Sequence, residues 1–94
     1  MTAYLESTTM DYLGWTNWAT RNVNVWLDKE ESLYREKVRF LRTTPSITAA
    51  KVRAFCLECF PRGTPDMRSS VEMDEVDWVH LAESWAAEAN KYRQ

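Results

Sequence analysis

Hydrophobic side chains recur along most of the chain at the three- and four-residue intervals of amphipathic helices. The first such segment predicts a helix over 16–27, where Thr16 or Asn17 offers the side-chain oxygen of an N-cap. Its inward stripe consists of Trp18, Asn22, Val25 and Trp26, widened by Val23 and Leu27. Residues 1–14 show no sustained period and end at Gly14, so we expect an irregular N-terminal arm there.

A second helix is predicted over 29–43, because Asp28 and Glu31 have the three-residue spacing of a capping box. Its buried face would hold Leu33, Tyr34, Val38 and Leu41. Its outer face would show Arg35, Glu36, Arg39 and Arg42. Pro45 disfavours helical backbone at the residue before it and ends the segment.

Two further helices follow the proline. One is predicted over 47–60, with Ser46 as its N-cap and an inward stripe of Val52, Phe55, Cys56, Cys59 and Phe60. After a turn, 66–73 is expected to be an ordered loop. The last helix is predicted over 74–92, because Asp74 and Asp77 suit the positive end of a helix dipole. Its stripe consists of Trp78, Leu81, Ala82, Trp85, Ala89 and Tyr92.

These elements predict an all-α fold, a compact bundle of three to four helices that forms a single domain over 1–94. Composition agrees, since 45% of the residues are hydrophobic, five are Trp and only two are Gly. No apolar run approaches the roughly 20 residues of a membrane span, and no basic segment precedes an apolar stretch. We therefore expect a soluble protein without membrane partners.

Candidate catalytic chemistry is sparse. Cys56 and Cys59 form a C-x-x-C that closes a predicted helix, where core packing is the main interpretation and a metal or redox site the alternative. A zinc site would need two further ligands, and His80 is the single histidine. With two glycines, no phosphate-binding glycine loop is possible. We expect no enzyme activity, no catalytic residues, no cofactor and no metal.

Charge is distributed unevenly along the chain. Residues 28–53 hold seven basic side chains against four acids, whereas 70–94 hold six acids against two basic side chains. Either segment could be an ordinary solvated helix face or an electrostatic surface that attracts a partner.

A pattern over 17–34 resembles one found in small proteins of bacteriophages and mobile elements, N-Y-x-T-W-N-V-x-L-W-x-x-N-D-E-x-L-Y. A later segment of the chain is also similar to these proteins. It contains Gly63-Thr64-Pro65-Asp66 and, further on, Val76-Asp77-Trp78 leading into a helix. The chain departs from the pattern at Trp18, Arg21 and Met67, where Tyr, Trp and Gly are usual. These proteins have no assigned enzymatic activity, so the resemblance implies a phage or mobile-element setting in the bacterial host cytoplasm and transfers no catalytic residue.

That setting favours a non-enzymatic, phage-encoded protein that binds and inhibits a host defence complex such as CRISPR-Cas, in the manner of an anti-CRISPR protein. The expected partner-binding residues are Glu72, Asp74, Glu75, Asp77 and Trp15. The four acids would compete with nucleic acid for a basic channel, and Trp15 would be an exposed anchor.

Two alternatives remain open. The chain could be a nucleic-acid-associated regulator that uses the basic region 29–53, through Arg35, Arg39, Arg42, Lys51 and Arg53. Alternatively, it could be a homo-oligomeric scaffold, and the sequence favours neither a monomer nor a homodimer.

Overall fold

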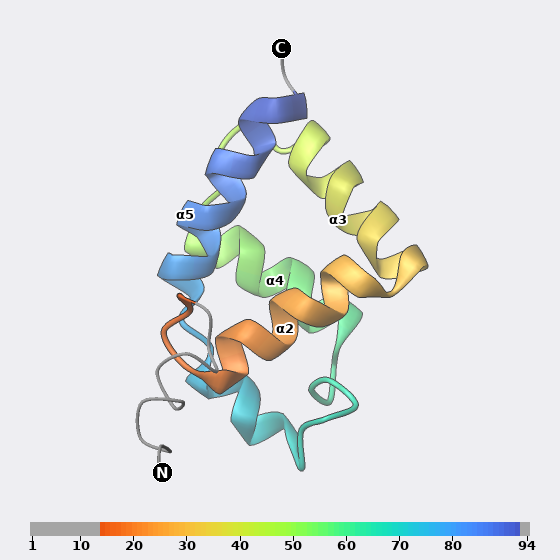
Figure 1. Cartoon of the computed structure of the whole chain (residues 1–94), viewed down its shortest axis with the longest axis vertical. Coiled ribbons are helices and arrows are strands. Elements are labelled where there is room, and N and C mark those ends of the chain that lie inside the picture. Colours follow the sequence, from red (N-terminus) through yellow and green to blue (C-terminus); the bar gives the residue numbers. More distant parts are fainter. Residues whose placement is uncertain (1–13, 93–94) are drawn as a thin grey trace, which may run out of the picture.

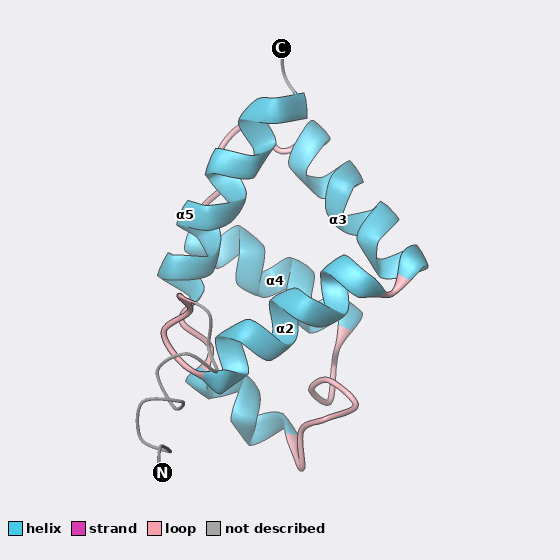
Figure 2. Ribbon diagram, in the orientation of Figure 1, coloured by secondary structure: helices cyan, strands magenta, loops and turns pink. Residues whose placement is uncertain are grey.

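A computed structural model describes residues 14–92, which fold into helices and connecting loops without a β-strand (Figures 1 and 2). The elements are α2 (Trp18–Lys29), α3 (Glu31–Thr43), α4 (Ala49–Cys59), η1 (Ser70–Glu75), α5 (Trp78–Ala89) and η2 (Asn90–Tyr92), where η denotes a 3₁₀-helix. The all-α prediction is confirmed. Most of the predicted arm, 1–13, lies outside the described residues.

The helices form an open triangle in projection (Figure 1). α2 packs against α3, α4 packs against α5, and η1 lies beside α2. α3 and α5 also contact one another, and their C-terminal ends converge at the top of the view.

The core is centred on Trp85 of α5, whose side chain is fully buried. Its ring meets Phe40 of α3 and Phe55 of α4 edge-on, at centroid distances of 6.0 and 5.9 Å. Its indole N–H donates to Asn24 Oδ1 of α2 at 3.0 Å. One side chain therefore contacts all three of the other α-helices in the described part of the chain.

A buried lysine adds an electrostatic link between the same helices. Lys37 of α3 is only 1% exposed, and its Nζ lies 2.7 Å from Asp28 of α2 and 3.0 Å from Glu88 of α5. The ammonium also sits 5.1 Å from the centre of the Trp85 ring. Lys37 was counted with the basic surface of 28–53, but two carboxylates already neutralise it inside the fold.

The predicted helix boundaries require corrections at the caps. Asn17 caps α2 as expected, by accepting from Thr20 N–H at 2.9 Å. The predicted Asp28 capping box is wrong, because Glu30 caps α3 and Asp28 instead binds Lys37. Thr48, not Ser46, caps α4. The four helices predicted over 16–27, 29–43, 47–60 and 74–92 thus begin two to four residues later than expected.

The segment predicted as a loop at 66–73 also differs. Residues 70–75 form η1 and bury Met73, and α5 starts only after Asp77 caps it. The helix predicted over 74–92 is therefore divided among η1, α5 and η2.

Two inward stripes were assigned partly to the wrong residues. Trp18 is 37% exposed, whereas Ala19 and Val23 of α2 are buried. Tyr34 is 38% exposed, whereas Lys37 and Leu41, three and seven residues later on α3, are buried. The stripes of α4 and α5 follow the prediction, with Val52, Cys56 and Trp85 fully buried.

None of the helices in the described part combines the length and the apolar composition needed to cross a membrane.

We predict that Lys37→Met destabilises the fold by about 2–4 kcal/mol, because it leaves the carboxylates of Asp28 and Glu88 close together without a counter-charge. Urea unfolding followed by tryptophan fluorescence measures this. The control, Arg35→Met, breaks the exposed Arg35–Glu31 pair and should cost less than about 1 kcal/mol. Equal losses in the two variants would contradict a structural role for the buried ammonium.

Candidate functional site

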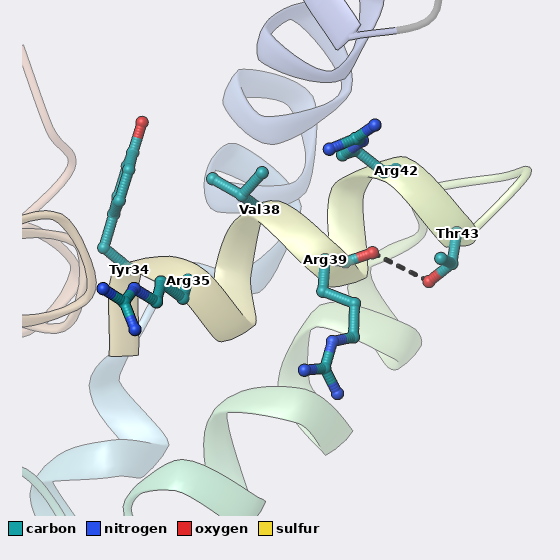
Figure 3. A pocket seen from close by; sticks show the side chains of 6 residues that line it. All are labelled: Tyr34, Arg35, Val38, Arg39, Arg42 and Thr43. Atoms are coloured by element: carbon teal, nitrogen blue, oxygen red, sulfur yellow. Dashed lines mark hydrogen bonds between the residues drawn. The ribbon is translucent and has the colours of Figure 1, made fainter. Parts of the chain in front are cut away.

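An open hollow of about 610 Å³ lies along the outer face of α3 (Figure 3). Its lining residues are Tyr34, Arg35, Val38, Arg39, Arg42 and Thr43. We call this set the α3 arginine face. All six residues belong to one helix, so the hollow is a shallow surface depression and its shape follows from helical spacing.

The side chains of the α3 arginine face form two neighbouring rows. Tyr34, Val38 and Arg42 are four residues apart and point to the same side of α3 (Figure 3). Arg35 and Arg39 form the adjacent row, and Arg39 points away from that side. An apolar strip of Tyr34 and Val38 is thereby flanked by guanidinium groups.

The guanidinium groups are weakly engaged within the protein. Arg35 lies 2.6 Å from Glu31 and Arg39 lies 3.5 Å from Glu36, and all four side chains are substantially exposed. Arg42 has no ion-pair partner within residues 14–92. Exposed pairs of this kind contribute little, because water and salt screen them. An external anion can therefore compete for these arginines.

Tyr34 is held at one end of the hollow by its hydroxyl. The hydroxyl oxygens of Tyr34 and Tyr92 lie 3.4 Å apart, which links α3 to η2. The hydrogen bond with Tyr34 raises the pKa of Tyr92 to about 12. Tyr34 was predicted to be buried, and its exposure adds an aromatic ring that sequence periodicity had assigned to the core.

The residues of the predicted basic surface are only partly brought together. Arg35, Arg39 and Arg42 line the hollow, whereas Lys51 and Arg53 are exposed on α4 and do not line it. Lys51 Nζ donates to the carbonyl oxygen of Ser46 at 3.1 Å. Of the five predicted basic residues, the hollow therefore includes the three arginines of α3, while Lys51 and Arg53 are exposed on α4.

The predicted acidic surface is divided between free and engaged carboxylates. Asp77 caps α5, accepting from His80 N–H at 3.0 Å and from the Thr16 hydroxyl at 2.8 Å. These bonds hold the pKa of Asp77 below its usual value. Glu72 accepts from the backbone N–H of Arg68 at 2.7 Å. Asp74 and Glu75 are exposed, so they form the open part of this surface.

Trp15 was predicted to be exposed, but it is half-buried against His80. The two rings lie 4.9 Å apart between centroids. Because the Thr16 hydroxyl donates its one proton to Asp77, it accepts from His80 Nδ1, 2.8 Å away. Of the five tryptophans, Trp18 is the most exposed.

A second, smaller hollow of about 450 Å³ lies between the end of α2, the start of α3 and the loop after α4. Its lining residues are Trp26, Glu30, Leu33, Cys59, Phe60, Pro61, Arg62, Gly63 and Pro65. Burial raises the pKa of Cys59 here and of the fully buried Cys56, which makes both thiols less prone to form the reactive thiolate. Within the described residues, no three His, Cys, Asp or Glu side chains gather as a metal site.

The two segments that carry the phage-protein resemblance contact each other. Asn22 accepts a hydrogen bond from the Thr64 hydroxyl and donates to Asp66 at 2.8 Å. The indole N–H of Trp26 donates to the same Asp66 oxygen at 2.9 Å. Asn17 donates to the carbonyl oxygen of Glu75 at 2.8 Å. These residues of the pattern therefore join α2 to the 63–66 loop and to η1, which is a structural role.

No protein-family model matches the chain, and neither does any curated protein or solved structure.

We predict that Asp66 contributes an acid-sensitive part of the stability. The hydrogen bonds from Asn22 and Trp26 hold the pKa of Asp66 below its usual value of 3.8, so the ionised form stabilises the fold. This stabilisation is complete above that value and is lost as the pH falls through the lower folded pKa. Thermal unfolding of wild type and Asp66→Asn, from about pH 6 to about pH 3, measures it.

The Asp66→Asn protein should lose less stability than wild type over the acidic part of this range. Asp74→Asn is the matched control, since it removes one charge at an exposed position with no hydrogen bond to its carboxylate among the described residues. If Asp66→Asn and wild type show parallel pH profiles, the Asn22–Asp66–Trp26 contacts do not have the assigned role.

Proposed function

We propose that this chain is a non-enzymatic binding protein that docks on the phosphate backbone of a nucleic acid through its α3 arginine face. The observation that supports this proposal is the set of three guanidinium groups, from Arg35, Arg39 and Arg42, around one open hollow. A guanidinium is the side chain best suited to phosphate, because its planar fork donates two parallel hydrogen bonds.

The spacing of the arginines is compatible with several phosphates of one strand. At 1.5 Å of rise per residue, Arg35 and Arg42 are about 10 Å apart along the axis of α3. One strand of a B-form duplex has about three phosphates over that length of its axis. Each arginine can therefore meet a separate phosphate.

The formal net charge of −2 does not oppose this proposal, because most of the acids lie outside α3, and the two acids within it, Glu31 and Glu36, form only exposed ion pairs with Arg35 and Arg39. Most of the acids after residue 65 lie on the 66–68 loop, η1 and α5, while α3 presents its arginines on the opposite side from its buried Lys37. Lys37 is itself neutralised by Asp28 and Glu88 and adds little to the surface potential. With only three contacts we expect weak binding that is sensitive to salt.

The test compares two variants that each remove three positive charges. Arg35→Gln/Arg39→Gln/Arg42→Gln should bind a labelled oligonucleotide about tenfold or more weakly than wild type, because it loses three charge-assisted contacts. The slope of log affinity against log salt should change from about −2 or −3 to near zero. Fluorescence anisotropy at several salt concentrations measures both quantities.

The matched control is Arg53→Gln/Arg62→Gln/Arg68→Gln, which changes the net charge equally at exposed arginines outside the hollow. It should keep most of the affinity and of the salt slope. Equal losses in the two variants would show that net charge, not the α3 arginine face, governs binding. No salt-dependent binding by wild type would end the proposal.

A second candidate function is inhibition of a host defence complex such as CRISPR-Cas, in line with the phage-protein resemblance. It is favoured by the exposure of Asp74 and Glu75, which together with Glu72 form an acidic edge on η1. Such an edge could occupy a basic nucleic-acid channel and form charge-assisted bonds with its Arg and Lys side chains.

This candidate predicts that Asp74→Asn/Glu75→Gln weakens inhibition without a loss of folding. Phage plaquing on bacteria with active CRISPR immunity, with the protein expressed in the host, measures inhibition. Glu58→Gln/Glu83→Gln removes two other exposed carboxylates and should inhibit like wild type. If wild type leaves immunity intact, or the η1 variant inhibits fully, the acidic edge does not act as proposed.

A further inference from the structure

We propose that the α3 arginine face prefers a single-stranded nucleic acid over a duplex, with one base stacked on the ring of Tyr34. This inference rests on the proposed nucleic-acid function and specifies the partner of the same surface.

The first support is the position of Tyr34. Its side chain is 38% exposed and stands at one end of the hollow, on the same side of α3 as Val38 (Figure 3). Aromatic rings next to a positively charged groove are how single strands are commonly bound, because every base has a face that can stack. The apolar strip of Tyr34 and Val38 can receive bases while the arginines receive phosphates.

The second support is that Tyr34 is already oriented before binding. Its hydroxyl lies 3.4 Å from that of Tyr92, which restricts the ring at the end of the hollow. A restricted side chain loses less conformational entropy when a base stacks on it. The contact between Tyr34 and Tyr92 therefore favours the stacking of a base on Tyr34 and adds no charge to the surface.

The third support is that a duplex has no exposed base face to pack against the apolar strip of Tyr34 and Val38. In a duplex the base faces are covered by their neighbours, so a protein meets phosphates, sugars and the base edges in the grooves. The arginines of α3 could then meet phosphates or base edges, but the exposed apolar strip of Tyr34 and Val38 would have no base face to pack on. A single strand can engage both rows of the α3 arginine face.

The experiment measures the affinities of wild type and Tyr34 variants for a labelled single strand of about twelve nucleotides and for its duplex. Wild type should bind the single strand at least several times more tightly. Tyr34→Leu keeps apolar bulk but removes the stacking surface, so it should weaken single-strand binding about tenfold and leave duplex binding nearly unchanged.

Two variants control for the lost hydroxyl contact. Tyr34→Phe keeps the ring, and Tyr92→Phe removes the partner hydroxyl, so both should retain most of the single-strand preference and lose only the small part that comes from the pre-oriented ring. Thermal unfolding of each variant establishes that it is folded at the assay temperature.

The outcomes separate this inference from the function on which it rests. Binding of both nucleic acids with equal affinity, unchanged by Tyr34→Leu, would overturn the single-strand preference and leave the phosphate-binding function standing. Binding of neither nucleic acid would overturn both. If a polyglutamate peptide displaces the single strand as effectively as unlabelled single strand does, the surface recognises negative charge alone, and the stacking proposal is wrong.

Discussion

The indole ring of Trp85 is the contact on which the helix arrangement depends, since it meets side chains from α2, α3 and α4 at once. Its contacts with α3 come from Phe40 and from the Lys37 ammonium. The side of α3 that carries Phe40 and Lys37 packs against Trp85. Because an α-helix has 3.6 residues per turn, Arg35, Arg39 and Arg42 then lie on the opposite side, toward solvent. The exposed arginines are thus a consequence of how α3 packs on α5.

The buried ammonium of Lys37 also determines how charge is distributed on the surface. It forms ion pairs with Asp28 and Glu88 and so supplies the counter-charge for these two carboxylates. The exposed basic groups of α3 are consequently arginines, and among residues 14–92 their ion pairs are formed within α3 itself. The acids of η1 lie on a different element, next to α2, so the two charged surfaces are borne by separate parts of the fold.

Helical periodicity was sufficient to predict the fold class and the core stripes of α4 and α5, because those stripes depend on local spacing. It failed where contacts between distant residues decide the outcome. Lys37 is buried because carboxylates from residues 28 and 88 reach it, and Asp77, besides capping α5 locally, also accepts from the distant Thr16. Tyr34 has the spacing of a core residue, yet it is 38% exposed and its hydroxyl lies beside that of Tyr92 in η2. The arginines of the site could be predicted from sequence, whereas the aromatic ring beside them could not.

Binding at the α3 arginine face is tested most directly by mapping backbone amide shifts in an NMR titration with a single-stranded oligonucleotide. The account predicts that the largest shifts fall within residues 34–43, with smaller effects at Tyr92 through its contact with Tyr34. Shifts concentrated in η1 or around the second hollow, with 34–43 unchanged, would contradict it.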